Sequence, residues 1–168
     1  MSETASRLMD LAEAHIRDSG YGGFSFRDLA AQIGIKSASV HHHFPTKAIM
    51  VAAVARRYGE RFFAKVEAKP GESAVDAYKN AFRESFTEDG KMCLYGVLGT
   101  EAGGLTEEVS GEIIAFFRRC IDDLASRIDG PEAKAKAFHV LATLEGGLML
   151  ARAYNDIEAF DHAVAGLA

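Results

Sequence analysis

The sequence has few cysteines and no long apolar run. Its two cysteines, Cys93 and Cys120, do not form a CxxC pair, which excludes the usual zinc motifs and a disulfide framework. No stretch of about 18 residues is apolar throughout, so no ordinary membrane-spanning helix is predicted. The N-terminal residues carry acidic side chains and lack the basic-then-apolar layout of a secretory signal. We therefore expect a cytoplasmic protein with reduced cysteines and no membrane partner.

The motifs of common enzyme classes are also missing. The sequence contains no GxSxG, no HExxH, no phosphate-binding loop and no paired-carboxylate motif. The pairs Gly103-Gly104 and Gly146-Gly147 follow no predicted strand, so they do not match a dinucleotide-binding fingerprint. We expect a protein that is not an enzyme and needs no cofactor. An enzyme remains an alternative, which turnover of a bound ligand would support.

The net charge of −5 hides a difference between the two ends of the chain. Residues 1–69 contain 10 basic and 7 acidic side chains, whereas residues 70–168 contain 9 basic and 17 acidic ones. Such a contrast is typical of a protein of which one end meets phosphate and the other does not. The charge pattern therefore indicates that an N-terminal part binds nucleic acid.

Apolar residues recur at helical spacing along the chain, and no stretch alternates with the period of a strand. Ser25 can cap a helix, with Asp28 three residues later in a capping-box position, and Gly34 suits the end of that helix. Pro45 stops the next helix, and Thr46 can cap the one after it. We predict an all-α fold of about nine helices, the first around Leu8 to Ile16 and the others at about 25–34, 37–43, 46–66, 72–87, 91–103, 107–128, 131–154 and 157–166.

A helix-turn-helix of about 20 residues can begin at Phe26. Two short crossing helices need apolar contacts, a small residue at the crossing and a glycine at the turn. Ala30 and Gly34 supply the last two, and the apolar contacts come from Leu29, Ile33, Ile35 and Val40. The third helix would then present small and hydrogen-bonding side chains to a major groove, namely Lys36, Ser37, Ala38, Ser39, His41 and His42. An ordinary helical hairpin has the same apolar spacing.

The run GGFSFRDLAAQIGIKSASVHHHFPTKAIM, residues 22–50, resembles the DNA-binding domain of the TetR family. That family shows a G-x-x-x-F-S-type entry, an I-A-x-x-x-G-V turn and then L-Y-x-H-F-x-x-K. The segment His43-Phe44-Pro45-Thr46-Lys47 is the specific part of the match, because a generic hairpin has little reason to be followed by it. The resemblance covers about residues 4–66, two-fifths of the chain.

The resemblance implies a DNA-reading domain with a core position at Phe44. It implies that Lys47 holds a phosphate, helped by the free N–H groups at the start of the fourth helix. His41 stands where the family commonly has a phosphate-gripping tyrosine, so the phosphate contact of this position is open. The predicted DNA-binding residues are Arg27, Lys36, Ser37, Ala38, Ser39, His41, His42, Thr46 and Lys47. A helical module that has lost DNA recognition is an alternative.

The three consecutive histidines, His41, His42 and His43, do not indicate a metal site. Side chains at i, i+1 and i+2 of a helix point in different directions and cannot converge on one ion. We therefore predict no metal ligands in this run.

The predicted helix 131–154 is apolar on two sides. Phe138, Leu141 and Met149 mark one face, and the other carries Val140, Leu144, Gly147, Leu148 and Ala151. One side can be the domain's own core and the other a partner subunit, with Gly146-Gly147 allowing close approach. The helix 157–166 would complete a four-helix interface, as the resemblance implies. We predict a homodimer through these two helices on a near-palindromic operator. A wholly buried central helix is the alternative.

Polar groups among apolar ones suggest a site for a small-molecule inducer of unknown identity. Glu145 is a lone carboxylate in an apolar turn, which either binds a donor of the ligand or pairs with Arg118, Arg119 or Arg152. Glycines in residues 90–104 leave space beside a helix. The predicted ligand residues are Phe82, Phe86, Cys93, Tyr95, Phe116, Phe117, Cys120, Glu145 and Met149. Plain core packing is the alternative for the apolar ones.

Lys69-Pro70-Gly71 is the one good linker candidate, and it coincides with the change of charge. We predict a helix-turn-helix domain over 1–66, including the linking fourth helix, and a ligand-binding and dimerisation domain over 67–168. The predicted function is a transcriptional repressor that a small molecule releases from its operator. A repressor that senses oxidants or electrophiles through the Cys93 thiol is the alternative, although a buried inert cysteine has the same sequence pattern.

Overall fold

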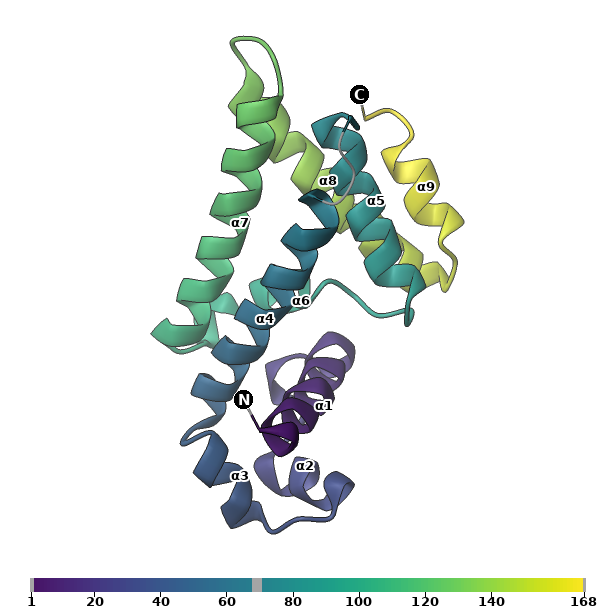
Figure 1. The fold of residues 1–168 in the computed structure, drawn as a ribbon. Helices are drawn as coiled ribbons and strands as arrows, with labels where there is room; N and C mark the ends of the chain where they lie inside the picture. The colour runs from purple at the N-terminus through teal and green to yellow at the C-terminus, as the bar shows by residue number, and fades with distance from the viewer. Residues whose placement is uncertain (1, 68–70, 168) are drawn as a thin grey trace. The chain divides into compact units, whose positions relative to one another are not determined.

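The computed structural model describes residues 2–67 and 71–167, and in these ranges it is all-helical. It contains nine α-helices, two 3-10 helices and no strand within the described residues, which confirms the predicted fold class (Figure 1). The elements are α1 (Glu3–Ser19), η1 (Tyr21–Gly23), α2 (Phe26–Ile33), α3 (Ser37–His43), α4 (Lys47–Glu67), α5 (Ala74–Thr87), α6 (Leu94–Thr100), η2 (Ala102–Gly104), α7 (Glu107–Arg127), α8 (Ala133–Tyr154) and α9 (Glu158–Val164).

The predicted caps place the ends of the early helices. Ser25 and Asp28 form a reciprocal capping box at the start of α2, with hydrogen bonds in both directions. Gly34 ends α2 in the left-handed conformation, at φ 73°. The Thr46 hydroxyl accepts a hydrogen bond from the Ile49 amide at 3.2 Å and so caps α4. These residues therefore mark both ends of α2 and the start of α4, as predicted.

Two predicted features differ from the structure or lie outside it. The helix predicted over 91–103 is shorter, because α6 covers only Leu94–Thr100 and is followed by the 3-10 turn η2. Four glycines within residues 96–104 lower the helix propensity of this stretch, which explains the early end. In the predicted linker, Lys69 and Pro70 lie outside the described residues, and Gly71 stands in a turn with φ 94°.

The described residues group into two compact units. The first unit contains the residues up to Tyr58 together with Leu94–Ile113, and the second contains Gly59–Cys93 and the residues from Ile114 onward. The helices α4 and α7 each contribute residues to both units. Each unit has its own buried core.

The core of the first unit joins α1, α2, α3 and α6. Leu8, Leu29, Val40 and Leu98, one from each helix, are fully buried. The Tyr95 hydroxyl donates a hydrogen bond of 2.6 Å to the Ala55 carbonyl, which ties α6 to α4.

A second tie connects the segment after α6 with the end of α1. The Glu101 carboxylate accepts hydrogen bonds from the Tyr21 amide at 3.2 and 3.3 Å. Gly20, directly before Tyr21, has φ 74° and lies against this carboxylate. Residues from far along the sequence therefore complete the unit that contains the helix-turn-helix.

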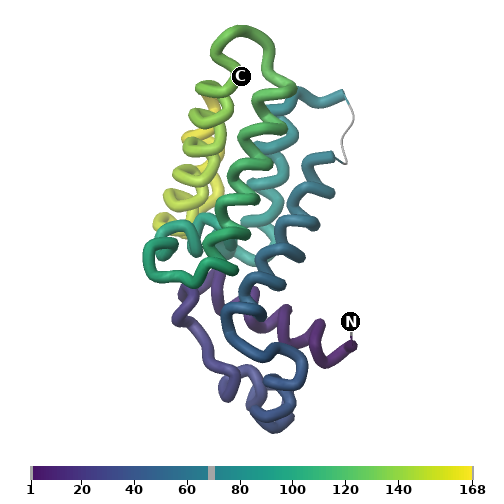
Figure 2. The backbone as a smooth tube through the Cα atoms, turned by 90° about the vertical axis from the view of Figure 1, so that its left-hand side faces the viewer, coloured from purple at the N-terminus to yellow at the C-terminus, as the bar shows by residue number. Residues whose placement is uncertain are grey.

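The core of the second unit contains a cluster of aromatic rings and a close contact between two helices. Phe62 lies within 5.0–5.9 Å, between ring centroids, of Tyr78, Phe82 and Phe116. Helices α8 and α9 lie side by side in both ribbon and tube views (Figures 1 and 2). A Cβ at Gly147 would meet the Phe160 ring at 3.0 Å, so the glycine permits this close packing.

No helix within the described residues is both long and apolar enough to cross a membrane.

Candidate functional site

The α2–α3 hairpin is built so that its apolar side is buried and its polar side is exposed. Leu29, Ala30 and Val40 are almost fully buried, and Phe44, directly after α3, is 7% exposed. Phe44 therefore has the core position that was predicted for it. The outward residues of α3 face solvent, as a helix that enters a groove requires.

The predicted DNA-binding residues are all in the first unit, on α2, on α3 and at the start of α4. Ser37 and Lys47 are partly buried. The exposed members are Arg27, Lys36, Ala38, Ser39, His41, His42 and Thr46. A short stretch of chain thus gathers small, hydroxyl and basic side chains on accessible surface.

Lys47, which is predicted to bind a phosphate, also has contacts within the chain. Its ammonium donates a hydrogen bond to the Phe24 carbonyl and lies over the rings of Tyr21 and Phe24, at 4.8 and 4.2 Å from their centroids. Burial lowers the pKa of Lys47, although Asp28 and Glu101 counteract this. Because an ammonium group has three N–H donors, two remain for a phosphate. Lys47 therefore also stabilises the turn between α1 and α2.

His41 is oriented by its neighbours. Its Nδ1 lies 3.4 Å from the Pro45 carbonyl, and its ring packs edge-on against Phe26 at 4.9 Å between centroids. Since a carbonyl only accepts, Nδ1 carries the proton in the neutral ring. In that tautomer Nε2 is a hydrogen-bond acceptor. Within the described residues, no group of three or more potential ligands is arranged around a metal position.

The predicted ligand residues are divided between the units. Tyr95 belongs to the first unit, where its ring also meets Tyr58. The other eight belong to the second unit, where Phe82, Phe86, Cys93, Phe116 and Cys120 are buried, Phe117 and Glu145 are partly exposed, and Met149 is 58% exposed. Five of them therefore form part of an interior, while Met149 faces solvent.

Glu145 is the one charged group of this set, and its carboxylate is buried. Both oxygens are closed to solvent and accept no hydrogen bond of normal geometry within the described structure. Burial raises the pKa of Glu145 to about 7, and the neighbouring Cys93 thiol offsets this in part. Two of the three predicted arginine partners bind elsewhere, since Arg119 pairs with Glu67 and Arg152 donates to the Gly90 carbonyl, while Arg118 is exposed. The carboxylate thus has no countercharge.

Both thiols are buried, Cys93 with 1% and Cys120 with 0% of its surface exposed. Burial, and next the nearby Glu145 carboxylate, raise the pKa of the Cys120 thiol. A thiol reacts with oxidants as an accessible thiolate. The environment of the two cysteines therefore gives no support to the thiol-sensing alternative.

Glu145 also lines a small apolar pocket between α7 and α8. The pocket has a volume of about 320 Å³. Its walls are Phe117, Ile121, Phe138, Leu141, Ala142 and Glu145. Sequence reasoning placed Phe138 and Leu141 on one helix face but missed Ile121 and Ala142 as wall residues, because only the packing of α7 on α8 brings them together.

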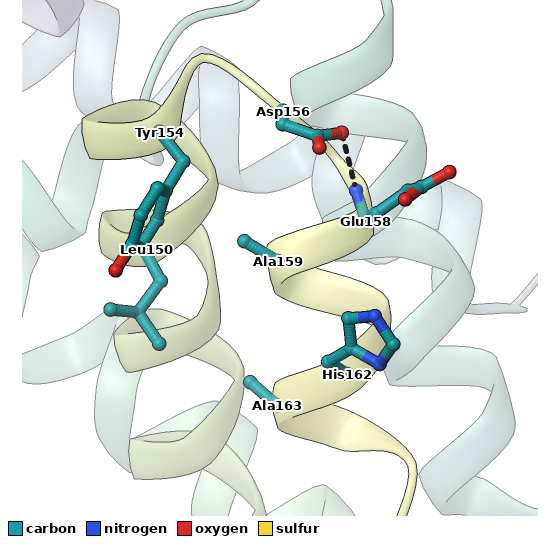
Figure 3. Close-up of a pocket in the computed structure, with 7 residues that line it drawn as sticks. All are labelled: Leu150, Tyr154, Asp156, Glu158, Ala159, His162 and Ala163. Carbon is teal, nitrogen blue, oxygen red and sulfur yellow. Dashed lines mark hydrogen bonds between the residues drawn. The ribbon is translucent and has the colours of Figure 1, made fainter.

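A second, larger groove of about 630 Å³ lies between α8 and α9 (Figure 3). Figure 3 shows Leu150 and Tyr154 on α8 opposite Ala159 and Ala163 on α9. His162, Asp156 and Glu158 line the groove as well, and the Asp156 carboxylate accepts a hydrogen bond from the Glu158 amide. On α8 the face with Val140, Leu144, Gly147, Leu148 and Ala151 is buried, whereas Phe138, Met149, Leu150 and Tyr154 are between 46% and 72% exposed. α8 therefore presents several exposed apolar side chains.

Comparisons with known proteins agree with this architecture. The sequence pattern of bacterial regulatory proteins of the tetR family matches residues 8–54. An uncharacterised HTH-type transcriptional regulator of Mycobacterium tuberculosis is 29% identical over 175 residues, which cover 96% of this chain and 90% of that protein.

Solved structures of TetR regulators share the whole fold. A TetR transcriptional regulator from Legionella pneumophila is 29% identical, with a TM-score of 0.89 over 99% of this chain and 96% of that one. A TetR-family regulator from Agrobacterium tumefaciens is 27% identical, with a TM-score of 0.87 over 96% and 94%. Together with the α2–α3 hairpin and the all-α fold, these matches show that the chain belongs to the TetR family of transcriptional regulators, whose members bind DNA and dimerise.

Proposed function

We propose that this protein is a repressor that binds a near-palindromic double-stranded operator as a homodimer and leaves it when a small molecule binds the C-terminal part. In this proposal residues 1–66 carry DNA recognition, and residues 67–168 carry ligand binding and dimerisation. A regulator of this kind acts on chromosomal DNA, so we place it in the cytoplasm.

The observation that carries the proposal is the α2–α3 hairpin, with its apolar residues buried and the outward side of α3 accessible. The side chains of Ala38 and Ser39 are small, which lets α3 approach base edges closely. Lys36 and Arg27 are exposed cations that suit backbone phosphates. The N–H groups at the start of α4, close to Thr46 and Lys47, add a further phosphate position.

A homodimer has two helix-turn-helix domains, one from each copy. The exposed apolar residues at the C-terminal end of α8, Met149, Leu150 and Tyr154, and the adjacent α8–α9 groove are the proposed interface, which pairs these two helices with those of the second copy. A twofold dimer would place its two recognition helices about 34–36 Å apart, one turn of DNA. A ligand that favours another spacing would weaken operator binding through a coupling energy of about 1–3 kcal/mol.

The test is binding to labelled duplexes from the region upstream of the protein's own gene, measured by fluorescence anisotropy at several salt concentrations. Affinity is expected to fall steeply with salt, and Lys36→Ala is expected to reduce the logarithmic salt slope by about one. Lys134→Ala removes an exposed cation from the start of α8 and is the matched control, with no change of slope.

Lys47→Ala is a less clean variant, because it removes a predicted phosphate contact and also the hydrogen bond to the Phe24 carbonyl. Its effect on DNA affinity has to be read beside its effect on the melting temperature. Binding to no duplex from that region, or binding that is insensitive to salt, would contradict the proposed function and favour a module that has lost DNA recognition.

A further inference from the structure

The α7–α8 pocket combines an apolar wall with a buried carboxylate that has no countercharge and only the Cys93 thiol as a neighbouring donor. Five of its six wall residues are apolar, and Glu145 is the sixth. An occupant of the pocket therefore touches the Glu145 side chain. Because both carboxylate oxygens are closed to solvent, contact with a charge in the pocket requires the Glu145 side chain to turn toward the occupant.

A buried carboxylate without a countercharge is costly, and a ligand can remove that cost. A neutral donor supplies a hydrogen bond alone, whereas an ammonium group supplies both a hydrogen bond and the missing countercharge. Of the three arginines predicted as partners, Arg119 pairs with Glu67, Arg152 donates to the Gly90 carbonyl, and Arg118 is exposed. Above about pH 7, where the carboxylate is ionised, a bound cation can supply the missing charge.

Two further features favour a cation over a neutral or anionic ligand. Phe117 and Phe138 present aromatic rings in the pocket wall, and ring faces attract cations. Residues 70–168, with 17 acidic and 9 basic side chains, produce a negative field that attracts cations and repels anions. Both effects act in the same direction as the carboxylate.

We propose that the inducer is a compact organic cation, an ammonium group on an apolar body, whose charge binds the Glu145 carboxylate and whose body fills the α7–α8 pocket. The volume of about 320 Å³ is at the small end of the range for ligand pockets, so the apolar body is of the size of one aromatic ring with a short chain. This inference rests on the proposed function, because it names the chemical class of the ligand.

The experiment uses the full chain and three probes of nearly one shape but different charge: phenethylammonium, 2-phenylethanol and phenylacetate. Binding is measured by titration calorimetry at pH 8, where the amine and Glu145 both carry charge. We expect phenethylammonium to bind at least about tenfold more tightly than 2-phenylethanol, since a charged hydrogen bond replaces a neutral one. We expect no binding of phenylacetate.

Three variants locate the site. Glu145→Gln keeps the shape and is expected to remove the preference for the cation, while Ala142→Leu fills the pocket and is expected to weaken cation and alcohol alike. Glu132→Gln changes an exposed carboxylate just before α8 and is the control, with wild-type affinities expected. Size-exclusion chromatography with light scattering accompanies each variant.

The outcomes separate the inference from the proposed function. Absence of millimolar binding of phenethylammonium, or an unchanged preference in Glu145→Gln, overturns the inference even when operator binding is intact. Dissociation of a dimer by Glu145→Gln, with cation affinity unchanged, assigns the carboxylate to the subunit interface and overturns it too. Tight cation binding by a chain that binds no operator supports the inference and contradicts the repressor.

Discussion

The α2–α3 hairpin and the interior of the second unit use polar side chains in opposite ways. On the hairpin, polar groups either close a helix cap, as Ser25 and Asp28 do, or stand exposed. In the second unit, the Glu145 carboxylate is closed to solvent and has no countercharge. The proposed DNA contacts therefore use side chains that water already solvates, whereas the proposed ligand contact uses a group that the fold has desolvated. The contrast teaches that the second kind of site lowers stability and the first kind does not.

The largest effect is expected at the tie within the first unit. A side chain at position 20 would displace the Glu101 carboxylate from the Tyr21 amide, and φ 74° is a conformation that suits glycine. We expect Gly20→Val to lower the free energy of unfolding by about 4 kcal/mol, because backbone strain adds to the loss of the Glu101 hydrogen bonds. Chemical denaturation measures the change. Gly22→Ala, which meets nothing within 4 Å, is the control, and an equal loss there would contradict this account.

The second effect tests the unsatisfied carboxylate of the other unit. The pKa of Glu145 is raised from 4.5 to about 7 in the folded state. Between these values the unfolded chain has released a proton that the folded chain still holds, so this group makes stability fall as the pH rises from about 4.5 to 7. We expect Glu145→Gln to be the more stable protein at pH 8 by up to about 3 kcal/mol, a difference that vanishes near pH 4.5.

Urea denaturation at pH 5, 6.5 and 8 measures this difference. The titratable groups that interact with the carboxylate are Cys93, from the segment before α6, and Cys120 on α7, whose thiol pKa is raised by burial. Arg152, on α8 itself, is bound to the Gly90 carbonyl. A stabilisation that does not change with pH would show that Glu145 is already neutralised by a partner.

A smaller effect on stability distinguishes a hairpin residue that caps a helix from one that is proposed to contact DNA. Ser25→Ala removes half of the capping box and is expected to cost about 1 kcal/mol of stability. Ser39→Ala removes an exposed hydroxyl of α3 and is expected to leave stability within about 0.5 kcal/mol while weakening operator binding. Melting curves and duplex titrations on both variants test this. A larger stability loss for Ser39→Ala than for Ser25→Ala would reverse the two assignments.

The smallest effect is expected from the ion pair between α5 and α9. Arg83 donates two hydrogen bonds to the Asp161 carboxylate, at 2.8 and 2.9 Å, and this pairing lowers the pKa of Asp161. Both side chains are more than 40% exposed, so the pair is screened by water. A double-mutant cycle of Arg83→Gln and Asp161→Asn is expected to give less than about 1 kcal/mol, and a larger value would mean that burial is greater than the structure shows.

The sequence predicts the helices best where a single side chain ends them. Ser25, Gly34 and Thr46 act on their own backbone within three or four residues, so their effect can be read locally. The end of α6 was missed because four weak helix formers together shorten it, and no one of them marks the boundary.

The proposed DNA-binding surface and the α7–α8 pocket also differ in how much of each the sequence predicts. The outward residues of α3 follow from helical spacing, and the lone Glu145 is visible in its apolar turn. The pocket wall is not, because Ile121 and Ala142 meet only once α7 packs on α8. Helical spacing also does not predict where a long arginine side chain points. Arg119 stacks over the Phe63 ring and pairs with Glu67 rather than with the Glu145 carboxylate.

The contribution of Leu94–Ile113 to the first unit has a consequence for chimeric regulators. A reading head cut from this chain at the glycine after Pro70 would lose α6, its buried Leu98 and the Glu101 contact with the Tyr21 amide. The apolar side of α1 that α6 covers would then meet water. A transplant that gives this DNA specificity to another scaffold has to carry the later segment along, or the recipient has to offer a matching replacement for it.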